Sequence, residues 1–278
     1  MRLRSLLFVP GDRPERFNKA AASGADAIIL DLEDSVAPEA KQEARAAVAT
    51  CLGQSSEVSR LVRINPVDAG CLSADVDAAR GADGVVLPKA EGSATIHALV
   101  DAWGAACLPI LPIATETPAA IFRLGDYATV ERHLCGLTWG AEDLPAAIGA
   151  AASREADGRY TQPYELVRSL TLFAAHAAGV AAIETVFPAL SDDAGLAAYA
   201  ARGARDGFTG MMAIHPRQVP IINAAFAPSD EALDAARRLL AAAAEAGQGA
   251  FRFEGRMVDA PHLKQARALL ARAGRPLP

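Results

Sequence analysis

Short apolar runs recur along the chain and alternate with longer stretches of helical periodicity. Within each run the apolar residues do not alternate with polar ones, which is typical of strands covered on both faces in a parallel sheet. Such runs predict eight strands, at residues 5–10, 27–34, 60–66, 84–89, 108–116, 135–144, 181–188 and 207–216.

The stretches between these runs carry helix start and stop signals. Proline stands just inside several predicted helix starts and glycine follows the predicted ends, which suits the fixed proline φ and the left-handed C-terminal cap. The predicted helices span residues 14–23, 38–52, 92–103, 163–178, 192–202 and, after the last strand, 230–245. The connection at 144–180 is long, and its polar segment 153–163 is interpreted as an active-site loop.

Eight strands, each followed by a helical segment, predict an α/β fold of the TIM (β/α)8 barrel type. We expect the barrel to be the catalytic domain at residues 1–228. Residues 229–278 then form a C-terminal helical extension. A doubly wound open sheet is the alternative, but the chain has no GxGxxG motif after its first strand and no P-loop.

Ionisable and amide side chains follow nearly every predicted strand. In a barrel the carboxyl ends of the strands meet at one face, and active sites of this fold lie there. The sequence therefore predicts a polar site at the mouth of the barrel. Its candidate members are Asp31, Glu33, Asp34, Arg63, Asn65, Lys89, Glu116, Glu142, Asp143, Glu184 and His215.

Two of these acids, Glu116 and Asp143, end consecutive predicted strands, and neighbouring strands lie roughly 5 Å apart. Carboxylates that close must share a proton or a cation. Oxygen ligands without Cys or His nearby favour Mg2+. Arg63 is suited to pair with a substrate carboxylate. The pattern predicts a metal-bound oxo-acid and chemistry that breaks or forms a C–C bond beside a carbonyl.

Three alternatives remain open at this point. Glu116 is also placed to interact with the N-terminus of a helix beginning near Pro118. Lys89 could form a Schiff base in a metal-free aldolase, although nearby carboxylates would keep its amine protonated. His215 precedes Pro216 and has either a structural or a catalytic role.

Composition narrows the class of protein further. The formal net charge of −6 argues against nucleic-acid binding. The four cysteines are scattered without metal-binding spacing, which indicates free thiols in a reducing compartment. No apolar run approaches the roughly 20 residues of a membrane span. We therefore expect a cytoplasmic protein without a membrane partner.

Seven ordered segments between residues 3 and 273 resemble the citrate lyase β-subunit-like proteins, within the aldolase family that also contains malyl-CoA lyases. They are "RSLLFVPGDRPERFNKA", "ADAIILDLEDSVAPEAKQEAR", "VRINP", "VVLPKAE", "WGAEDLPAAIG", "GMMAIHPRQVPIINAAFAPS" and "GRMVDAPHLKQA". The resemblance implies a TIM barrel with a C-terminal extension, assembled as a homotrimer. It also implies Mg2+-dependent cleavage or formation of a citryl-, malyl- or citramalyl-type 3-hydroxyacyl-CoA, with a 2-oxo acid such as oxaloacetate and an acyl-CoA as the other partners.

The same resemblance implies roles for individual residues. Glu116 and Asp143 match the family's metal ligands, and Arg63 matches its substrate-carboxylate arginine. Glu33 and Asp34 match acidic residues near the metal-bound waters. The matching positions also make Arg13 and Lys19 contacts to the CoA phosphates, and Asp259 an acid/base contributed by a neighbouring subunit. A thioesterase that uses the same metal site and a non-catalytic subunit of a lyase complex are the alternative functions.

Overall fold

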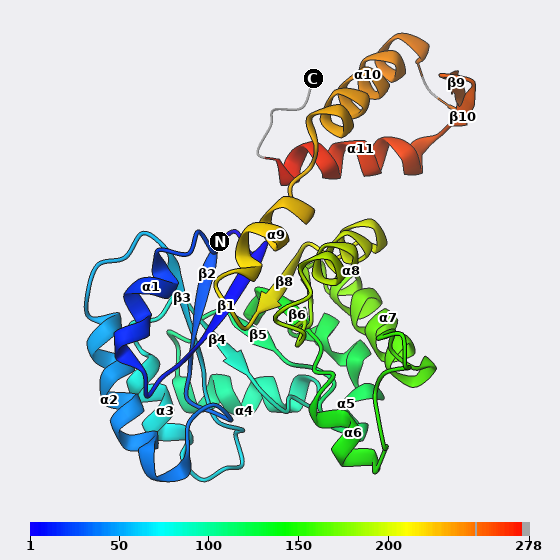
Figure 1. Ribbon diagram of the computed structural model, residues 1–278. Helices are drawn as coiled ribbons and strands as arrows, with labels where there is room; N and C mark the ends of the chain where they lie inside the picture. Colours follow the sequence, from blue (N-terminus) through cyan, green and yellow to red (C-terminus); the bar gives the residue numbers. More distant parts are fainter. Residues whose placement is uncertain (248, 274–278) are drawn as a thin grey trace. The chain divides into compact units, whose positions relative to one another are not determined.

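Eight short, buried strands form one parallel sheet in the computed structural model, which describes residues 1–247 and 249–273 (Figure 1). All eight predicted strands are present, and most end several residues earlier than predicted. They are β1 (Ser5–Pro10), β2 (Ala27–Asp31), β3 (Ser59–Arg63), β4 (Gly84–Leu87), β5 (Ile110–Pro112), β6 (Gly136–Thr138), β7 (Ala181–Glu184) and β8 (Gly210–Ala213).

The sheet closes on itself. Hydrogen-bonded neighbours run from β5 through β1 and β8 to β6. The two end strands, β5 and β6, are joined by parallel bridges, in which the Cys135 N–H donates to the Ile110 carbonyl at 2.9 Å and the Ala114 N–H donates to the Thr138 carbonyl at 2.9 Å. Closure confirms the predicted TIM barrel and excludes the open doubly wound sheet.

Helices and short 3-10 turns follow the strands and surround the barrel (Figure 1). The α-helices of this part are α1 (Phe17–Ala21), α2 (Lys41–Leu52), α3 (Leu72–Ala79), α4 (Ser93–Trp103), α5 (Pro118–Ile121), α6 (Asp143–Ile148), α7 (Gln162–Ala177), α8 (Asp193–Asp206) and α9 (Gln218–Ala225). The 3-10 turns span Pro14–Arg16, Pro38–Ala40, Leu124–Thr129 and Glu131–His133. Of all the helices in the described part of the chain, none has the length and apolar character needed to cross a membrane.

Side chains that point into the barrel form its core. They come from alternate positions of the strands and include Leu6, Ile29, Leu61, Val86, Leu111, Ile113, Ile183 and Met212. Because side chains alternate across a strand, the neighbours of these residues point outward to the helices. This apolar filling closes the interior of the barrel, so the polar groups at the strand ends lie above it at the mouth.

A second compact unit begins at Ala225, slightly before the predicted boundary at residue 228. It contains α10 (Asp230–Ala246), α11 (Ala260–Arg272) and a hairpin of β9 (Phe251–Phe253) and β10 (Arg256–Val258). Leu233, Leu240 and Leu270 pack between the two helices in a small core of their own. The hairpin turn consists of Glu254 and Gly255, both with positive φ, which is typical of a tight type I′ turn.

Candidate active site

A cavity of about 340 Å³ opens at the carboxyl ends of the barrel strands. Three of the residues predicted from the sequence, Arg63, Glu116 and Asp143, line this cavity. The structure therefore brings together the groups that were predicted from strand ends alone. Further acidic side chains in its wall are Asp31, Asp34 and Glu142, and its apolar wall includes Phe8, Ile113, Val186 and Met212.

Glu116 is almost completely buried at the cavity, with 4% of its surface exposed. The backbone N–H of Lys89 donates to Glu116 Oε2 at 2.5 Å. Burial, together with the charges of Asp143 and Glu33, raises the pKa of Glu116 to about 8, although the Lys89 N–H and charge act in the opposite direction. A carboxylate with this pKa is destabilised as an anion and is stabilised by any added cation.

Glu116 is not the cap of the helix that follows it. The helix α5 begins at Pro118, and the hydroxyl of Thr117 accepts the Ala120 N–H at 3.2 Å as its N-terminal cap. The capping alternative for Glu116 is thereby excluded, and its carboxylate is left for the cavity.

Gly140 has no side chain, and this leaves room for the side chain of Glu116. A Cβ atom built on Gly140 would lie 2.6 Å from Glu116 Cγ, closer than real Cβ atoms approach a neighbour. The absence of a side chain at Gly140 lets the loop after β6 pass directly over Glu116. Asp143 ends this loop as the first residue of α6, and its partly exposed carboxylate faces the same cavity.

Arg63 is already engaged by acidic neighbours. The register of β2 and β3 pairs Asp31 with Arg63, and the arginine donates from Nε and Nη2 to the two Asp31 oxygens at 2.6 Å each. Its Nη1 lies 2.8 Å from Glu33 Oε2. Burial would lower the pKa of Arg63, but Asp31 and Glu33 raise it above its ordinary value. A substrate carboxylate would have to use the remaining Nη1–Nη2 edge of the guanidinium.

The ammonium group of Lys89 lies between the carboxylates of Glu33 and Asp143. Its Nζ lies 2.5 Å from Glu33 Oε1 and 3.7 Å from Asp143 Oδ1. Burial would lower the pKa of Lys89, but the hydrogen bond and charge of Glu33 raise it above the ordinary lysine value. An ammonium held this way is a poor nucleophile, which argues against the Schiff-base alternative.

The loop after β2 is fixed by Lys41. Its Nζ donates to the carbonyl oxygens of Leu32 and Glu33 at 2.9 and 3.0 Å, and to Asn65 Oδ1 at 2.6 Å. These bonds hold the backbone of Glu33, which ion-pairs with both cations of the site. Burial raises the pKa of Glu33, and the charges of Arg63 and Lys89 only partly oppose it. Asn65 therefore supports the loop and does not line the cavity.

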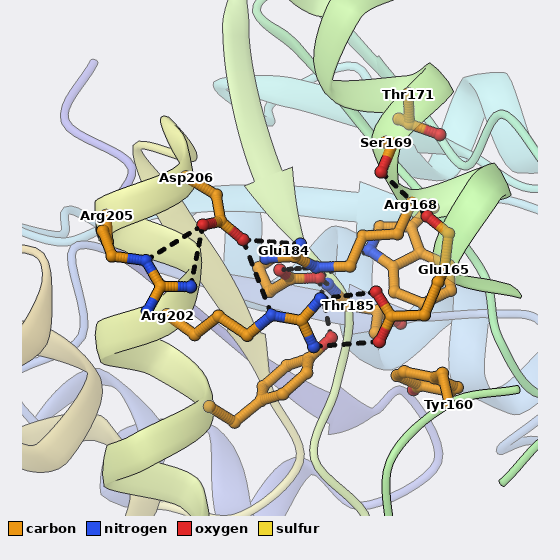
Figure 2. Close-up of polar contacts among 12 residues, drawn as sticks. Tyr160, Glu165, Arg168, Ser169, Thr171, Glu184, Thr185, Arg202, Arg205 and Asp206 are labelled. Carbon is orange, nitrogen blue, oxygen red and sulfur yellow. Dashed lines mark hydrogen bonds and ion pairs between the residues drawn. The ribbon is translucent and has the colours of Figure 1, made fainter. Parts of the chain in front are cut away.

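Other predicted residues do not belong to the wall of this cavity. Arg13 and Lys19 are exposed, and Arg13 pairs with Asp12 at 3.8 Å. Asp259 belongs to the second unit, where it caps α11 and lies 2.6 Å from His262 Nδ1. Glu184 ends β7 but points outward, where Arg168 donates to it (Figure 2). Neither His215 nor any residue of the segment 153–163 lines the cavity.

The donor set around the cavity suits Mg2+. Glu116 and Asp143 supply carboxylate oxygens, and Mg2+ is usually bound by one or two carboxylates with water and substrate completing its shell. Among residues 1–247 and 249–273, no group of three or more His, Cys, Asp or Glu side chains is arranged to hold a metal. A two-carboxylate site needs no such group, and an added positive charge would stabilise the ionised form of the buried Glu116, whose pKa is raised.

Residues 4–216 match the HpcH/HpaI aldolase/citrate lyase family, and the chain belongs to this family. This confirms both the predicted family and the predicted enzyme class, a lyase.

Individual relatives cover nearly the whole chain. It is 42% identical over 271 residues to a citrate lyase subunit beta-like protein of Mycobacterium tuberculosis, which covers 96% of this chain and 94% of that protein. It is 36% identical to a (3S)-malyl-CoA thioesterase and 33% identical to an L-malyl-CoA/beta-methylmalyl-CoA lyase, both of Cereibacter sphaeroides, each over 97% of this chain and 94% of the relative.

The fold also matches a solved structure closely. This is the CitE protein of Mycobacterium tuberculosis in complex with magnesium, acetoacetate and coenzyme A, with a TM-score of 0.84, 39% sequence identity and 99% of each chain covered. That protein thus binds magnesium, a small keto acid and coenzyme A.

The contacts that orient the site residues were not predicted from the sequence. Lys89 has a φ of 50°, a left-handed conformation that is uncommon outside glycine, and this conformation accompanies the bond from its N–H to Glu116. No local sequence signal indicates such a backbone. The outward direction of Glu184 was predictable, because Ile183 before it belongs to the barrel core and strand side chains alternate.

Proposed function

We propose that this chain is a Mg2+-dependent carbon–carbon lyase that cleaves or forms a 3-hydroxyacyl-CoA thioester of citryl, malyl or citramalyl type. Its products in the cleavage direction are a 2-oxo acid and an acyl-CoA. The observation that carries the proposal is the charge imbalance at the cavity, where six carboxylates and two cations lie in its wall or pair with residues of the wall. The acids are Asp31, Glu33, Asp34, Glu116, Glu142 and Asp143, and the cations are Arg63 and Lys89.

In this mechanism Glu116 and Asp143 hold the Mg2+, which polarises the carbonyl of the oxo-acid when it is bound. Arg63 orients the oxo-acid by pairing with its carboxylate through the free guanidinium edge. Asp31 and Glu33 fix the guanidinium plane, so this orientation costs little further side-chain freedom. Lys89 keeps Glu116 in place through its backbone N–H.

We assign the acid/base role to Asp259 of a neighbouring subunit. In the condensation direction its carboxylate would remove a proton from the methyl group of the acyl-CoA, and in cleavage it would return one. About half of the Asp259 side chain is exposed, so its carboxylate is accessible to a partner chain. We assign the CoA phosphates to the exposed Arg13 and Lys19, which suit phosphate oxygens as cations.

The acid/base role and the capping role of Asp259 can be separated. Asp259→Ser keeps an oxygen that accepts hydrogen bonds from the first turn of α11 but removes the carboxylate, whereas Asp259→Ala removes both. We expect both variants to lose turnover by about 100-fold, and only the alanine variant to lose about 1 kcal/mol of stability. Full activity of Asp259→Ser would reduce Asp259 to a helix cap.

We propose a homotrimer as the working assembly. The outer side of α7 exposes Leu166 and Phe173, two turns apart on one face, with 59% and 66% of their surfaces exposed. Large exposed apolar side chains in register on a helix are typical of an interface between subunits. Light scattering after size-exclusion chromatography should give three chains for the wild type and one for the Leu166→Glu/Phe173→Glu variant.

We place the enzyme in the cytoplasm. All four cysteines, Cys51, Cys71, Cys107 and Cys135, are free thiols. Unpaired cysteines without a metal are typical of a reducing compartment.

A thioesterase is the second candidate function. It is favoured by the 36% identity to the (3S)-malyl-CoA thioesterase, a level similar to the 33% identity to the malyl-CoA lyase. The same cavity would then direct water to the thioester carbonyl, and the product would be a free 3-hydroxy acid.

One experiment separates these functions. The purified chain is incubated with Mg2+ and either a 3-hydroxyacyl-CoA or a panel of acyl-CoA thioesters with glyoxylate, pyruvate or oxaloacetate, and the products are identified by mass spectrometry. Cleavage of the 3-hydroxyacyl-CoA to an oxo-acid and an acyl-CoA, or its formation from them, supports the lyase, and a free 3-hydroxy acid supports the thioesterase. The absence of any product from the whole panel would contradict both and favour a non-catalytic subunit.

A further inference from the structure

Two fully buried residues behind the active site are joined directly. Trp139 follows β6 and Glu184 ends β7, and neither side chain has measurable exposure. The indole Nε1–H of Trp139 donates to Glu184 Oε1 at 2.6 Å. Both side chains point out of the barrel toward the helices, because the neighbouring Gly140 and Thr185 line the cavity inside.

Glu184 is saturated with donors (Figure 2). Besides Trp139, its Oε1 accepts the Tyr199 hydroxyl at 2.8 Å and the Thr185 backbone N–H at 3.1 Å. Its Oε2 accepts Arg168 Nε at 2.7 Å. A buried carboxylate with this many donors has one well-defined position, since any movement would leave a buried group unpaired.

The backbone connects the hydrogen bond between Trp139 and Glu184 to the loop after β6 that carries Asp143. Gly140 comes next in the chain, and its N–H donates to Thr115 Oγ1 at 3.1 Å. Gly140 also lies directly over Glu116, and Asp143 follows three residues later. The loop is thus held by Thr115 on the cavity side and by Glu184 on the helix side.

We propose that Glu184 is a positioning residue that sets the Mg2+ affinity of the site by holding Trp139, and with it the loop that carries Asp143. The inference rests on the proposed metal role of Glu116 and Asp143. Among the donors to Glu184, only Trp139 adjoins the loop that carries Asp143, so only the loss of this donor should affect Mg2+ binding.

The test compares two variants that each remove one donor from the same oxygen. Trp139→Phe removes the indole N–H and keeps an aromatic ring, and Tyr199→Phe removes only a hydroxyl. We expect the dissociation constant of MgCl2, measured by isothermal titration calorimetry on the full chain, to rise about tenfold in Trp139→Phe, the loss expected for one charge-assisted hydrogen bond. Tyr199→Phe should bind Mg2+ as the wild type does.

Activity provides a second readout. At saturating Mg2+ the turnover number of Trp139→Phe should stay within about twofold of the wild type, because the effect acts through metal occupancy. Trp103→Phe, a buried tryptophan on α4, controls for the loss of an indole elsewhere in the barrel. If Trp139→Phe does not fold, Glu184→Gln replaces it; the amide oxygen can still accept the Trp139 N–H but without the negative charge, and we expect a smaller weakening of Mg2+ binding in the same direction.

Equal weakening in Trp139→Phe and Tyr199→Phe, or wild-type Mg2+ affinity in Trp139→Phe despite a lower melting temperature, would overturn the inference and leave Glu184 a purely structural residue. A wild-type chain that binds no Mg2+ in the calorimeter would overturn the proposed metal site itself. The two failures are therefore distinguishable.

Discussion

Two polar clusters lie on opposite sides of the barrel wall, and they differ in charge balance. The outer cluster, drawn in Figure 2, has equal numbers of acids and bases: Glu165, Glu184, Asp206, Arg168, Arg202 and Arg205. The mouth cluster has an excess of acids: Asp31, Glu33, Asp34, Glu116, Glu142 and Asp143 with Arg63 and Lys89.

The balanced cluster satisfies its own charges. Burial alone would raise the pKa of Asp206, but hydrogen bonds from Arg168 and Arg205 bring it below the ordinary value. In the mouth cluster Arg63 lowers the pKa of Asp31 in the same way, but the pKa values of Glu33 and Glu116 are raised. An acid whose pKa is lowered by its partners needs no ligand, whereas an acid whose pKa is raised is stabilised as an anion by an incoming cation. The mouth cluster therefore carries the chemistry, and the outer cluster supports it from behind the barrel wall.

The largest expected effect is the loss of activity when the mouth loses a metal ligand. Asp143→Asn should lower kcat/KM by about 1,000-fold, or about 4 kcal/mol of transition-state stabilisation, because an amide replaces one of two anionic ligands. Steady-state assays at several Mg2+ concentrations measure the effect. Asp157→Asn, at an exposed aspartate that pairs with Arg159, is the control and should leave activity unchanged. Wild-type turnover in Asp143→Asn would contradict the metal assignment.

The ion pairs of the outer cluster should respond in stability, and only its bond from Trp139 to Glu184 should affect ligand binding. Arg168→Met leaves Glu184 buried without its partner, and we expect a loss of about 3–5 kcal/mol in the free energy of unfolding measured with urea. Arg205→Met, at the exposed end of the same cluster, should change stability by less than about 0.5 kcal/mol. A loss below about 1 kcal/mol in Arg168→Met would mean that the balanced cluster contributes little to the fold.

Removing an acid from the mouth cluster should stabilise the folded protein, whereas removing Arg168 from the outer cluster destabilises it. The pKa of Glu116 is raised from the unfolded value of 4.5 to about 8, so the folded state keeps its proton after the unfolded state has lost it. Stability of the metal-free protein therefore falls as pH rises between these two values. Glu116→Gln removes this loss and should be more stable than the wild type by about 2–5 kcal/mol at about pH 9, where the upper value is the full difference between the two pKa values, with little difference at about pH 4.

Urea unfolding in the presence of a chelator measures this difference across the pH range. Saturating Mg2+ should reduce it at about pH 9, because the cation stabilises the wild-type carboxylate and not the amide. A wild type that is as stable as Glu116→Gln at both pH values would show that the mouth carries no electrostatic strain.

Strand position was predictable from the sequence, but the contacts that orient the site were not. The run at 108–116 placed Glu116 at the correct end of the barrel, although β5 itself covers only Ile110–Pro112. Apolar periodicity locates a buried segment, yet it does not show where the ladder of hydrogen bonds ends. The ion pair between Arg63 and Asp31 follows from the register of β2 and β3. This register is set only in the assembled sheet, so the sequence did not indicate the ion pair.

The smallest expected effect tests the space between the two ligand-bearing loops. A methyl group at Gly140 would lie 2.6 Å from Glu116 Cγ and 3.2 Å from Ile113 Cγ2, so Gly140→Ala must displace Glu116 or the loop that leads to Asp143. We expect Mg2+ binding to weaken about tenfold, or about 1.4 kcal/mol, in isothermal titration calorimetry. Gly125→Ala, where the added methyl meets no atom within 4 Å, is the matched control. A loss of Mg2+ affinity in Gly140→Ala alone would locate metal binding at the mouth, and equal affinities in both variants would contradict it.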